Sequence, residues 1–422
     1  MTTLNSPGQL SRPTSISQAT GNIKPVSWYE RQLRHRIVRL FDQLPGDLAL
    51  IFQDGDGQHE LGNPLRASHV GSITVHDPSL YRMMVWQGSL GACEAYLQGK
   101  WTTPDLFKTL CLFSRIFDTI NAMDTGSAWW FNRLQKLLES LRFNSRKGSR
   151  KNIAGHYDLS NQFFALFLDS TMMYSSACYD EPDMTLEDAS RNKLRKMCRK
   201  LQLESNDHLL EIGTGWGGMA IHAARETGCR VTTTTISSAQ HQFASQRIRE
   251  AGLEDRIKLL QQDYRDLRGS FDKLVSIEMI EAVGQKYLVD YFRCCDRLLK
   301  PGGRMVIQAI VIPEQREAVY ARSVDFIQRY IFPGSFLPSI AQLQHAVGAA
   351  TRLRMVQLQD YTPSYVLTLR EWRKRFHAQL AEVRQLGFDE RFIRMWDFYL
   401  ASCEAVFHER AAGLVQIEWV KQ

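Results

Sequence analysis

The chain has 422 residues, of which 44% are hydrophobic and 23% charged, and its formal net charge is +7. That length suits two or three domains, and the composition is typical of a folded globular protein and excludes a disordered or fibrous one. No stretch reaches the roughly 18–20 uninterrupted apolar residues of a membrane-spanning helix, and the N-terminus lacks a secretion signal. We therefore expect a cytoplasmic protein, whose eight cysteines are reduced thiols without disulfide or zinc-knuckle spacing.

The first part of the chain is predicted to form a tail and a small domain. Residues 1–26 are rich in Ser, Thr, Gln and Gly, which favours a disordered tail. Residues 27–125 are predicted to form a smaller mixed α/β accessory domain without a catalytic constellation, in which residues 88–96 form a partly buried packing, dimerising or positioning helix. Its other expected elements are a helix at 28–43 and strands at 48–53 and 72–75.

A basic linker is expected at 126–151. Much of its charge is concentrated in the run 142–151. Such a run is typical of segments that contact anionic lipid, and it is equally typical of a solvated linker. Because no RNA- or DNA-binding motif accompanies it, we expect no nucleic-acid partner.

Strands and helices alternate in the large domain expected at 152–422. This order predicts an α/β fold with a doubly wound, mostly parallel Rossmann-like sheet, whose ligand site lies at the carboxyl ends of the strands. The expected strands are 209–212, 231–236, 257–262, 273–277 and 304–312, and the expected helices are 217–227, 239–251 and 287–299.

A glycine-rich turn follows the first of these strands. Gly213, Gly215 and Gly217 follow the acidic Glu211, the first of them two positions later. Glycine lets the chain turn sharply and a ligand lie against the backbone. The third glycine comes one residue too early for the G-x-G-x-x-G turn of dinucleotide enzymes. The spacing instead resembles the turn of Rossmann-like methyltransferases, which hold S-adenosylmethionine, so we assign these four residues to the cofactor.

Further cofactor contacts are expected where the next strands end. After the second strand come Thr235 and Gln240, at a place where many methyltransferases carry an acidic residue for the ribose hydroxyls. After the third strand, Asp263 supplies a carboxylate and Tyr264 an aromatic face suited to adenine. The fourth strand is followed by Glu278 and by Glu281. Because they stand at a strand end, we expect site residues and not solvated surface acids, most clearly for Glu281.

Upstream blocks carry a more specific resemblance. Residues 156–164, 168–169 and 173–179 are not required by a bare methyltransferase fold. Together with the glycine turn they resemble the cyclopropane fatty acid synthase family, and in this segment Tyr174 and Ser175 are expected to contact the cofactor. The N-terminal domain resembles, more weakly, the accessory domain of bacterial members. Other matching blocks are 262–267, 276–284, 325–339 and 396–407.

The resemblance implies transfer of a methyl group from S-adenosylmethionine to the cis double bond of an unsaturated phospholipid acyl chain, after which the methyl carbon becomes a ring methylene. An alkene is a poor nucleophile, so the enzyme must aim it at the sulfonium methyl in a dry cavity and stabilise the resulting carbocation. A base then removes one proton. In the family that base is a bound bicarbonate, and its matching contacts here are Glu281, Tyr365 and the backbone of Ile310.

Two positions depart from the family pattern. Ser176 stands where a cysteine is usual, with Cys178 two residues later, and a main-chain contact would survive this change. Gln308 replaces a histidine, which keeps a hydrogen-bond donor and loses a titrating ring. We include Ser176 and Gln308 among the catalytic candidates, with bicarbonate as a possible active-site base.

Substrate contact is expected in two places. The aromatic and apolar segment 326–338 suits an acyl tunnel, although core packing explains most of its side chains. Reversible attachment to the inner face of the membrane is expected through the basic linker and through Trp129 and Trp130. The resemblance also suggests a homodimer that forms through the N-terminal domain.

Three alternatives remain open from the sequence. The same cation can lose a proton elsewhere, which gives a methylene or, after reduction by a partner, a methyl-branched chain, and Gln308 gives this variant weight. A cofactor-binding membrane scaffold without catalysis is the second. A small-molecule or nucleic-acid methyltransferase is the third, and it fails to explain residues 156–179.

Overall fold

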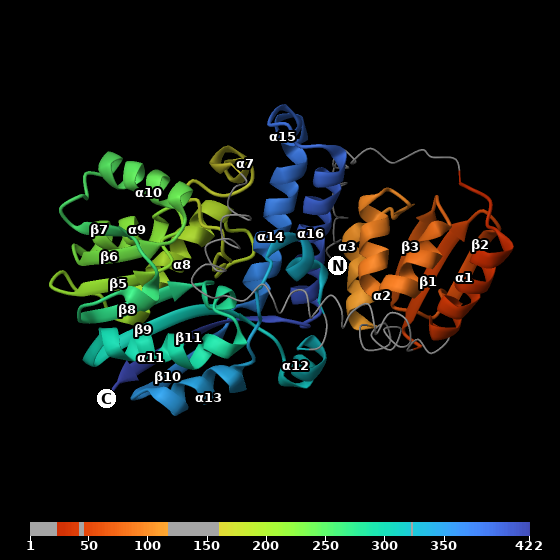
Figure 1. Cartoon of the computed structure of the whole chain (residues 1–422). Helices are drawn as coiled ribbons and strands as arrows, with labels where there is room; N and C mark the ends of the chain where they lie inside the picture. Colours follow the sequence, from red (N-terminus) through yellow and green to blue (C-terminus); the bar gives the residue numbers. More distant parts are fainter. Residues whose placement is uncertain (1–22, 42–45, 117–159, 322–323) are drawn as a thin grey trace, which may run out of the picture.

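The computed structural model describes residues 23–41, 46–116, 160–321 and 324–422. Two sheets organise these residues, a four-stranded sheet near the N-terminus and a seven-stranded sheet in the larger part (Figure 1). The helices α2 (Ser79–Leu97) and α3 (Leu106–Arg115) lie between the small sheet and the helices of the larger part. The larger sheet therefore meets the N-terminal elements through a helical layer.

The small sheet has the order β2-β1-β3-β4. Strands β1 and β3 are parallel, and β2 and β4 are antiparallel additions at the edges. The expected helix and both expected strands of this region are present, whereas β2 and β4 were not predicted because β2 is polar and β4 has only two residues. The bounds are α1 (Trp28–Phe41), β1 (Leu48–Asp54), β2 (Gly57–Gly62), β3 (His69–Val75) and β4 (Trp101–Thr102).

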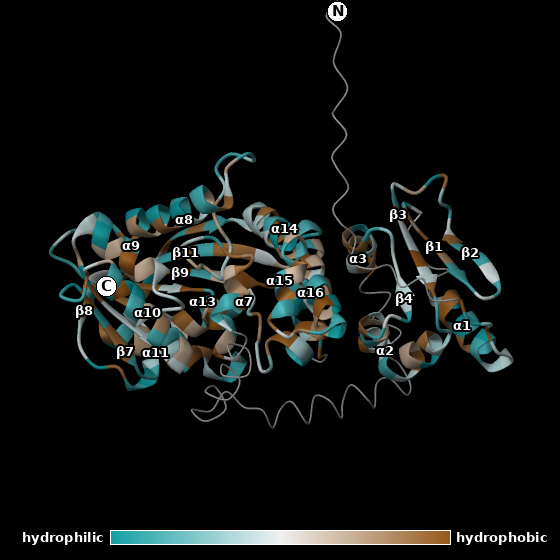
Figure 2. Cartoon of the chain, turned by 90° about the horizontal axis from the view of Figure 1, so that it is seen from above, coloured by the Kyte–Doolittle hydropathy of each residue, from teal (hydrophilic) through white to brown (hydrophobic). Residues whose placement is uncertain are grey.

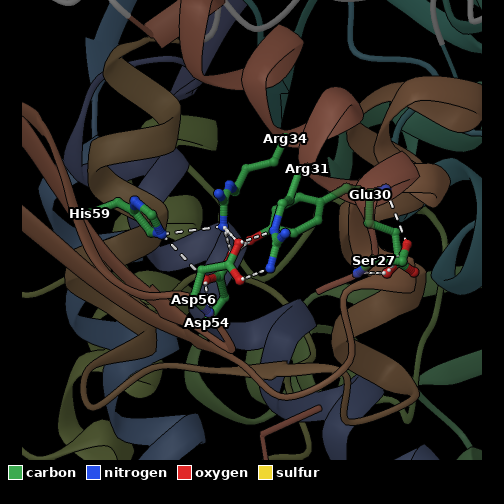
Figure 3. A network of polar contacts seen from close by, with 8 residues as sticks. Ser27, Glu30, Arg31, Arg34, Asp54, Asp56 and His59 are labelled. Carbon is green, nitrogen blue, oxygen red and sulfur yellow. Dashed lines mark hydrogen bonds and ion pairs between the residues drawn. The ribbon is translucent and has the colours of Figure 1, made fainter. Parts of the chain in front are cut away.

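A polar network attaches α1 to the β1–β2 hairpin (Figure 3). Arg34 pairs with the buried carboxylate of Asp54 at 2.7 Å, and Arg31 pairs with Asp56 at 2.7 Å. The hydroxyl of Tyr81 also donates to Asp54 at 2.6 Å. Because a buried carboxylate such as that of Asp54 is costly without partners, this network favours one orientation of the helix on the sheet.

The large sheet has the order β10-β11-β9-β8-β5-β6-β7. Five strands from β5 to β9 run parallel, as expected, and β11 runs antiparallel between β9 and β10. The mostly parallel, Rossmann-like fold is confirmed. The strands β10 and β11 were not predicted, and of these two β11 runs against the other strands of the sheet. The strands are β5 (His208–Ile212), β6 (Arg230–Thr235), β7 (Ile257–Gln261), β8 (Phe271–Ile277), β9 (Leu299–Val311), β10 (Leu353–Asp360) and β11 (Gly413–Lys421).

Helices cover both faces of this sheet and form a separate layer beside it (Figure 1). Hydrophobic residues gather on the central strands, and the outer faces of α8 and α14 are hydrophilic (Figure 2). This distribution is the one that burial of apolar surface produces. The helices are α7 (Asn161–Ala165), α8 (Leu186–Leu201), α9 (Gly218–Thr227), α10 (Ser238–Glu250), α11 (Leu288–Leu298), α12 (Glu314–Tyr320), α13 (Ile340–Ala350), α14 (Thr362–Ala378), α15 (Leu380–Gln385) and α16 (Glu390–His408).

The N-terminal helices pack against α16. The rings of Tyr96 and Phe398 lie 5.2 Å apart, and the carboxylate of Glu94 accepts hydrogen bonds from Tyr330 at 2.5 Å and from Arg391 at 2.9 Å. Helix α2 is thereby joined to the larger part by both apolar and charged contacts.

Several predicted features lie outside the described residues. They are most of the tail, the linker at 126–151 with its basic run, the Trp129–Trp130 pair, and residues 156–159 of the upstream block. Within the described ranges, no helix is long and apolar enough to cross a membrane.

Candidate active site

A single cavity of about 590 Å³ runs from the carboxyl ends of β5, β6 and β8 to helix α2 of the N-terminal part. Its volume is within the range that proteins use for small-molecule ligands. One end is lined by the glycine turn and polar side chains, and the other by apolar residues. The cavity therefore has a polar compartment and an apolar compartment.

The glycine turn lines the polar compartment. The φ angles of Gly213 and Gly215 are +100° and +54°, a region that favours glycine, and a Cβ at Gly215 would meet no protein atom within 4 Å. A Cβ at Gly213 would lie 3.2 Å from Met279. Gly217 does not line the cavity; it stands at the N-terminus of α9 with a φ of +86°. The backbone at Gly215 is thus open to a ligand, Gly213 lies close against Met279, and Gly217 shapes the turn.

Glu211 lies beneath this turn at the end of β5. Its carboxylate is buried, lines the cavity and accepts a hydrogen bond from the hydroxyl of Thr233 at 2.6 Å. Burial raises the pKa of Glu211 to about 8, because the hydrogen bond from Thr233 only partly offsets the desolvation of the charge. The residue is protonated at neutral pH when no cation is nearby.

The polar groups predicted after β6 meet in the cavity. Thr235 and Gln240 are both buried and both line it, and the hydroxyl of Thr235 donates to the side-chain oxygen of Gln240 at 2.9 Å. Gln240 is in the first turn of α10, whose N-cap is Ser237. This pair offers neutral donors and acceptors at the position expected for ribose hydroxyls.

Asp263 and Tyr264 also line the cavity, after β7. Asp263 is held by Arg265 through two contacts, of 2.9 and 2.6 Å, and this arginine lines the cavity too. Tyr264 packs edge-on against Tyr291 with 5.4 Å between the ring centres. Arg265 was not predicted as a site residue, although it follows Asp263 by only two positions in the sequence.

Tyr174 and Ser175 reach the cavity from the loop that precedes α8. The hydroxyls of Tyr174 and Tyr399 lie 2.8 Å apart, and the ammonium of Lys193 donates to the hydroxyl of Ser175 at 2.6 Å. Lys193 has no exposed surface, and this desolvation lowers its pKa while the charge of Glu278 opposes the change. A buried cation therefore lies behind Ser175.

Glu278 is the centre of a cluster at the end of β8. Its Oε1 accepts from the backbone N–H of Ser176 at 2.9 Å and from the amide of Gln308 at 2.7 Å, and its Oε2 accepts from the hydroxyl of Tyr365 at 2.8 Å. Its φ of +46° is unusual for a residue with a side chain and is a sign of local strain. Desolvation raises the pKa of Glu278, opposed by the charge of Lys193 and by these donors.

Glu281 occupies a separate position one turn later. Its Oε1 accepts from the backbone N–H of Ile310 at 2.6 Å, and its buried Oε2 has no hydrogen-bond partner. Burial raises the pKa of Glu281 to about 8, and the charge of Glu278 adds to the rise. Glu281 is thus protonated at neutral pH, whereas Glu278 has Lys193 and three hydrogen-bond donors that favour its ionised form.

The two departures from the family pattern lie behind these carboxylates. Ser176 and Gln308 are buried and absent from the cavity wall, and both donate to Glu278. The side-chain oxygen of Gln308 accepts from Gln416 at 2.9 Å, which fixes the direction of its amide. Cys178 is buried away from the cavity. Tyr365, Glu281 and Ile310, by contrast, line the cavity.

The apolar compartment combines residues from both parts of the chain. Phe326, Phe332 and Leu337 of the segment 326–338 line it, whereas Ile331 is buried outside it. The expectation that most of this segment only packs in the core was too narrow, because several of its side chains face the cavity. On the N-terminal side the wall is formed by α2 and α3, through Met84, Gly88, Ser89, Leu90, Ala92, Cys93, Leu110 and Phe113.

Helix α2 is bent where it meets the cavity. Gly88 has φ +58° and ψ −139°, which breaks the helical conformation, and a Cβ at Gly91 would lie 2.1 Å from the carbonyl oxygen of Met83. Only glycine fits this close backbone approach. The segment predicted as a packing or positioning helix therefore also forms the far wall of the cavity.

A mostly parallel sheet with a glycine turn at the carboxyl end of β5 defines a class I methyltransferase dependent on S-adenosylmethionine. The residues fit this cofactor for two reasons. The backbone at Gly215 is open to a ligand, and the surrounding side chains include both neutral polar and acidic groups. When bound there, S-adenosylmethionine supplies an electrophilic methyl group.

Comparisons with known proteins place the chain more closely. Residues 144–417 match the family model of mycolic acid cyclopropane synthetase, so the chain belongs to that family. It is 38% identical to the tuberculostearic acid methyltransferase UfaA1 of Mycobacterium tuberculosis, over 82% of this chain and 82% of that protein. It is 34% identical to the cyclopropane-fatty-acyl-phospholipid synthase of Escherichia coli K12, over 84% of this chain and 89% of that protein.

Solved structures agree with this placement. The mycolic acid cyclopropane synthase CmaA1 complexed with SAH and CTAB is 29% identical, has a TM-score of 0.61, and covers 64% of this chain and 98% of its own. The cyclopropane synthase MmaA2 from Mycobacterium tuberculosis is 26% identical, with a TM-score of 0.61 over 64% of this chain and 98% of its own. The resemblance stated from the sequence is confirmed, and the protein is an S-adenosylmethionine-dependent methyltransferase.

Proposed function

We propose that the protein transfers the methyl carbon of S-adenosylmethionine to the cis double bond of an unsaturated phospholipid acyl chain and closes a cyclopropane ring. The observation that carries this proposal is the continuity of the cavity, which joins the glycine turn to an apolar compartment. An alkene in such a compartment is shielded from water, as a carbocation requires. The two relatives that modify fatty acyl chains support the same reading.

The residues around the cavity have different roles in the proposed reaction. The turn at Gly213 and Gly215 holds the cofactor by its backbone, and the pair of Thr235 and Gln240 meets its ribose. The apolar compartment orients the acyl chain, and the N-terminal helices complete it. Aromatic faces of Tyr174 and Phe332, whose ring centres lie 6.2 Å apart, both border the cavity and are suited to stabilise positive charge on the alkene.

A second product is favoured by two observations. Gln308 stands where the family pattern has a histidine. The relative at 38% identity is named a tuberculostearic acid methyltransferase. The alternative activity gives a methylene group or, after reduction by a partner, a methyl branch. It uses the same methyl transfer, but a hydride first moves from the methylated carbon to the neighbouring cationic carbon. The positive charge then lies beside the methyl group, and loss of a methyl proton forms the C=CH₂ bond instead of the ring.

Because the substrate is a membrane lipid, the proposal includes reversible contact with the inner membrane surface and a homodimer as the working form. Sedimentation with vesicles that contain anionic phospholipid, at low and high salt, tests the first, and light scattering of the purified protein tests the second. Loss of binding in high salt is expected, since the attraction is screened. Binding that is independent of salt would contradict an electrostatic contact.

The deciding experiment is lipid analysis after incubation with methyl-labelled S-adenosylmethionine and vesicles of unsaturated phospholipid. We expect the acyl chain to gain one labelled CH₂ with the double bond consumed, seen by mass spectrometry and by the upfield proton signals of a cyclopropane. Vesicles with saturated chains are the control and should remain unlabelled. A labelled chain that retains unsaturation would establish the branched product instead, and no labelled lipid would refute both.

A further inference from the structure

Ring closure leaves one proton to be removed, and the cavity offers few groups that could accept it. The alkene π electrons form a bond to the methyl carbon while the S–CH₃ bond breaks and its electrons stay on sulfur. A cation remains on the other alkene carbon. A base must then take a proton from the former methyl carbon, so that the C–H electron pair closes the ring. The carboxylates that line the cavity in the described part of the chain are Glu211, Asp263, Glu278, Glu281 and Asp325.

Four of these five are poorly suited to the task. Glu211 and Glu281 have a pKa raised to about 8 by burial, so each carries its own proton at neutral pH. Asp263 is engaged by the guanidinium of Arg265 on both oxygens. Asp325 accepts from the backbone N–H of Gln328 at 2.7 Å at the start of a helical turn.

Glu278 differs from them in its hydrogen bonds. An ionised carboxylate has about four lone-pair positions, and three are occupied here by Ser176, Gln308 and Tyr365. Both donors from Ser176 and Gln308 go to Oε1, so Oε2, which accepts only from Tyr365, keeps one position open. All three partners donate and Lys193 lies nearby, and these groups favour the anion against the burial that raises the pKa of Glu278.

We propose that Glu278 is the proton acceptor for ring closure, built into the chain, and that Oε2 receives the proton from the transferred carbon. This inference rests on the proposed function. It assigns Ser176, Gln308 and Tyr365 as positioning residues that hold the carboxylate, and Lys193 as its counter-charge. The positive φ of Glu278 fits a side chain held in place by its function and not by backbone preference.

A bound bicarbonate does not fit the same place. Besides Glu281, the groups expected to hold it are the backbone of Ser176, Gln308, Tyr365 and the backbone of Ile310, and each of these four donates to a carboxylate of the chain itself. A further anion would lie beside the carboxylate of Glu278 with only the carboxyl group of Glu281 left as a donor. The carboxylate of Glu278 thus occupies the hydrogen-bonding position that the resemblance assigns to bicarbonate.

The first test removes the base and measures turnover and cofactor binding separately. Glu278→Gln keeps the shape of the side chain and should lower kcat by about 10²–10⁴-fold, the usual contribution of a general base. Its affinity for S-adenosylhomocysteine, measured by calorimetry, should stay within about twofold of wild type, which shows an intact fold. A near wild-type kcat of Glu278→Gln would overturn the assignment. So would a loss of kcat of this size in Asp325→Asn but not in Glu278→Gln.

The second test varies bicarbonate. The wild-type protein should keep its full rate in buffer freed of carbon dioxide. Glu278→Ala opens the space between the three donors, and added bicarbonate or formate should restore activity, whereas chloride at the same concentration should not. A wild-type rate that falls without bicarbonate, or restoration by chloride, would refute a built-in base. If the wild-type protein labels no lipid under any condition, the proposed function itself has failed.

Discussion

Replacement of Tyr365 by phenylalanine tests the cluster around Glu278 with little change to packing. The ring of Tyr365 stacks on Phe407 at 4.4 Å and meets Trp372 edge-on at 6.3 Å, and phenylalanine preserves both contacts. Only the 2.8 Å hydrogen bond to Oε2 of Glu278 is lost. A hydrogen bond to a charged group contributes about 1.5–3 kcal/mol, so the proton affinity of Glu278 should rise by roughly ten- to a hundredfold.

The sign of the effect is fixed by this hydrogen bond. It stabilises the carboxylate, which lowers the pKa of Glu278, so its removal raises the pKa further. The acid limb of log kcat against pH should move to higher pH, and the rate near neutral pH should fall while the rate at high pH recovers. The assay is lipid labelling from pH 6 to about 9.5. A uniform drop at every pH, or an unchanged profile, would refute the proposed role of Tyr365.

Three further predictions concern the cofactor, stability and chain length. Gly215→Ala places a Cβ at φ +54°, which should lower the free energy of unfolding by about 1–2 kcal/mol and weaken cofactor binding measured by calorimetry. Glu211 has a pKa of about 8 in place of 4.5, so its contribution to stability is complete below pH 4.5 and is lost as pH rises through 8. The midpoint temperature of thermal unfolding of cofactor-free Glu211→Gln should therefore fall less between pH 7 and about 9 than that of the wild-type protein. Parallel curves of midpoint temperature against pH would contradict this. Cys93→Phe narrows the apolar compartment and should reduce labelling of long acyl chains severalfold relative to short ones, while Arg82→Phe, exposed on the same helix, should not change the ratio.

The sequence identified the elements whose pattern is local. Alternating apolar strands and amphipathic helices between 209 and 312 predicted the parallel part of the sheet within about two residues at most ends. The strands β10 and β11 were not predicted, because β10 is largely exposed and β11 follows a long helical region. The place of β11 beside β9 depends on pairing between residues more than a hundred positions apart, such as Gln308 and Gln416, and β10 in turn pairs with β11.

The same division applies to the site. Spacing alone predicted the turn at Gly213 and Gly215, and resemblance indicated Glu281 and Tyr365, all of which line the cavity. The importance of Glu278 depends on which donors surround it, and these come from β9, α14 and the loop before α8. No periodicity in the sequence connects these segments.

The charges around the active-site carboxylates could not be predicted from the sequence either. Lys193 lies in α8, a helix whose sequence is rich in lysine and arginine and reads as solvated, yet this one side chain is completely buried beside Ser175. The sequence by itself determined the class of fold, the cofactor turn and the family, because these depend on local spacing and on blocks of residues. The tertiary structure alone decided which carboxylate carries charge, since a pKa depends on burial and on partners that the chain brings together only when it folds.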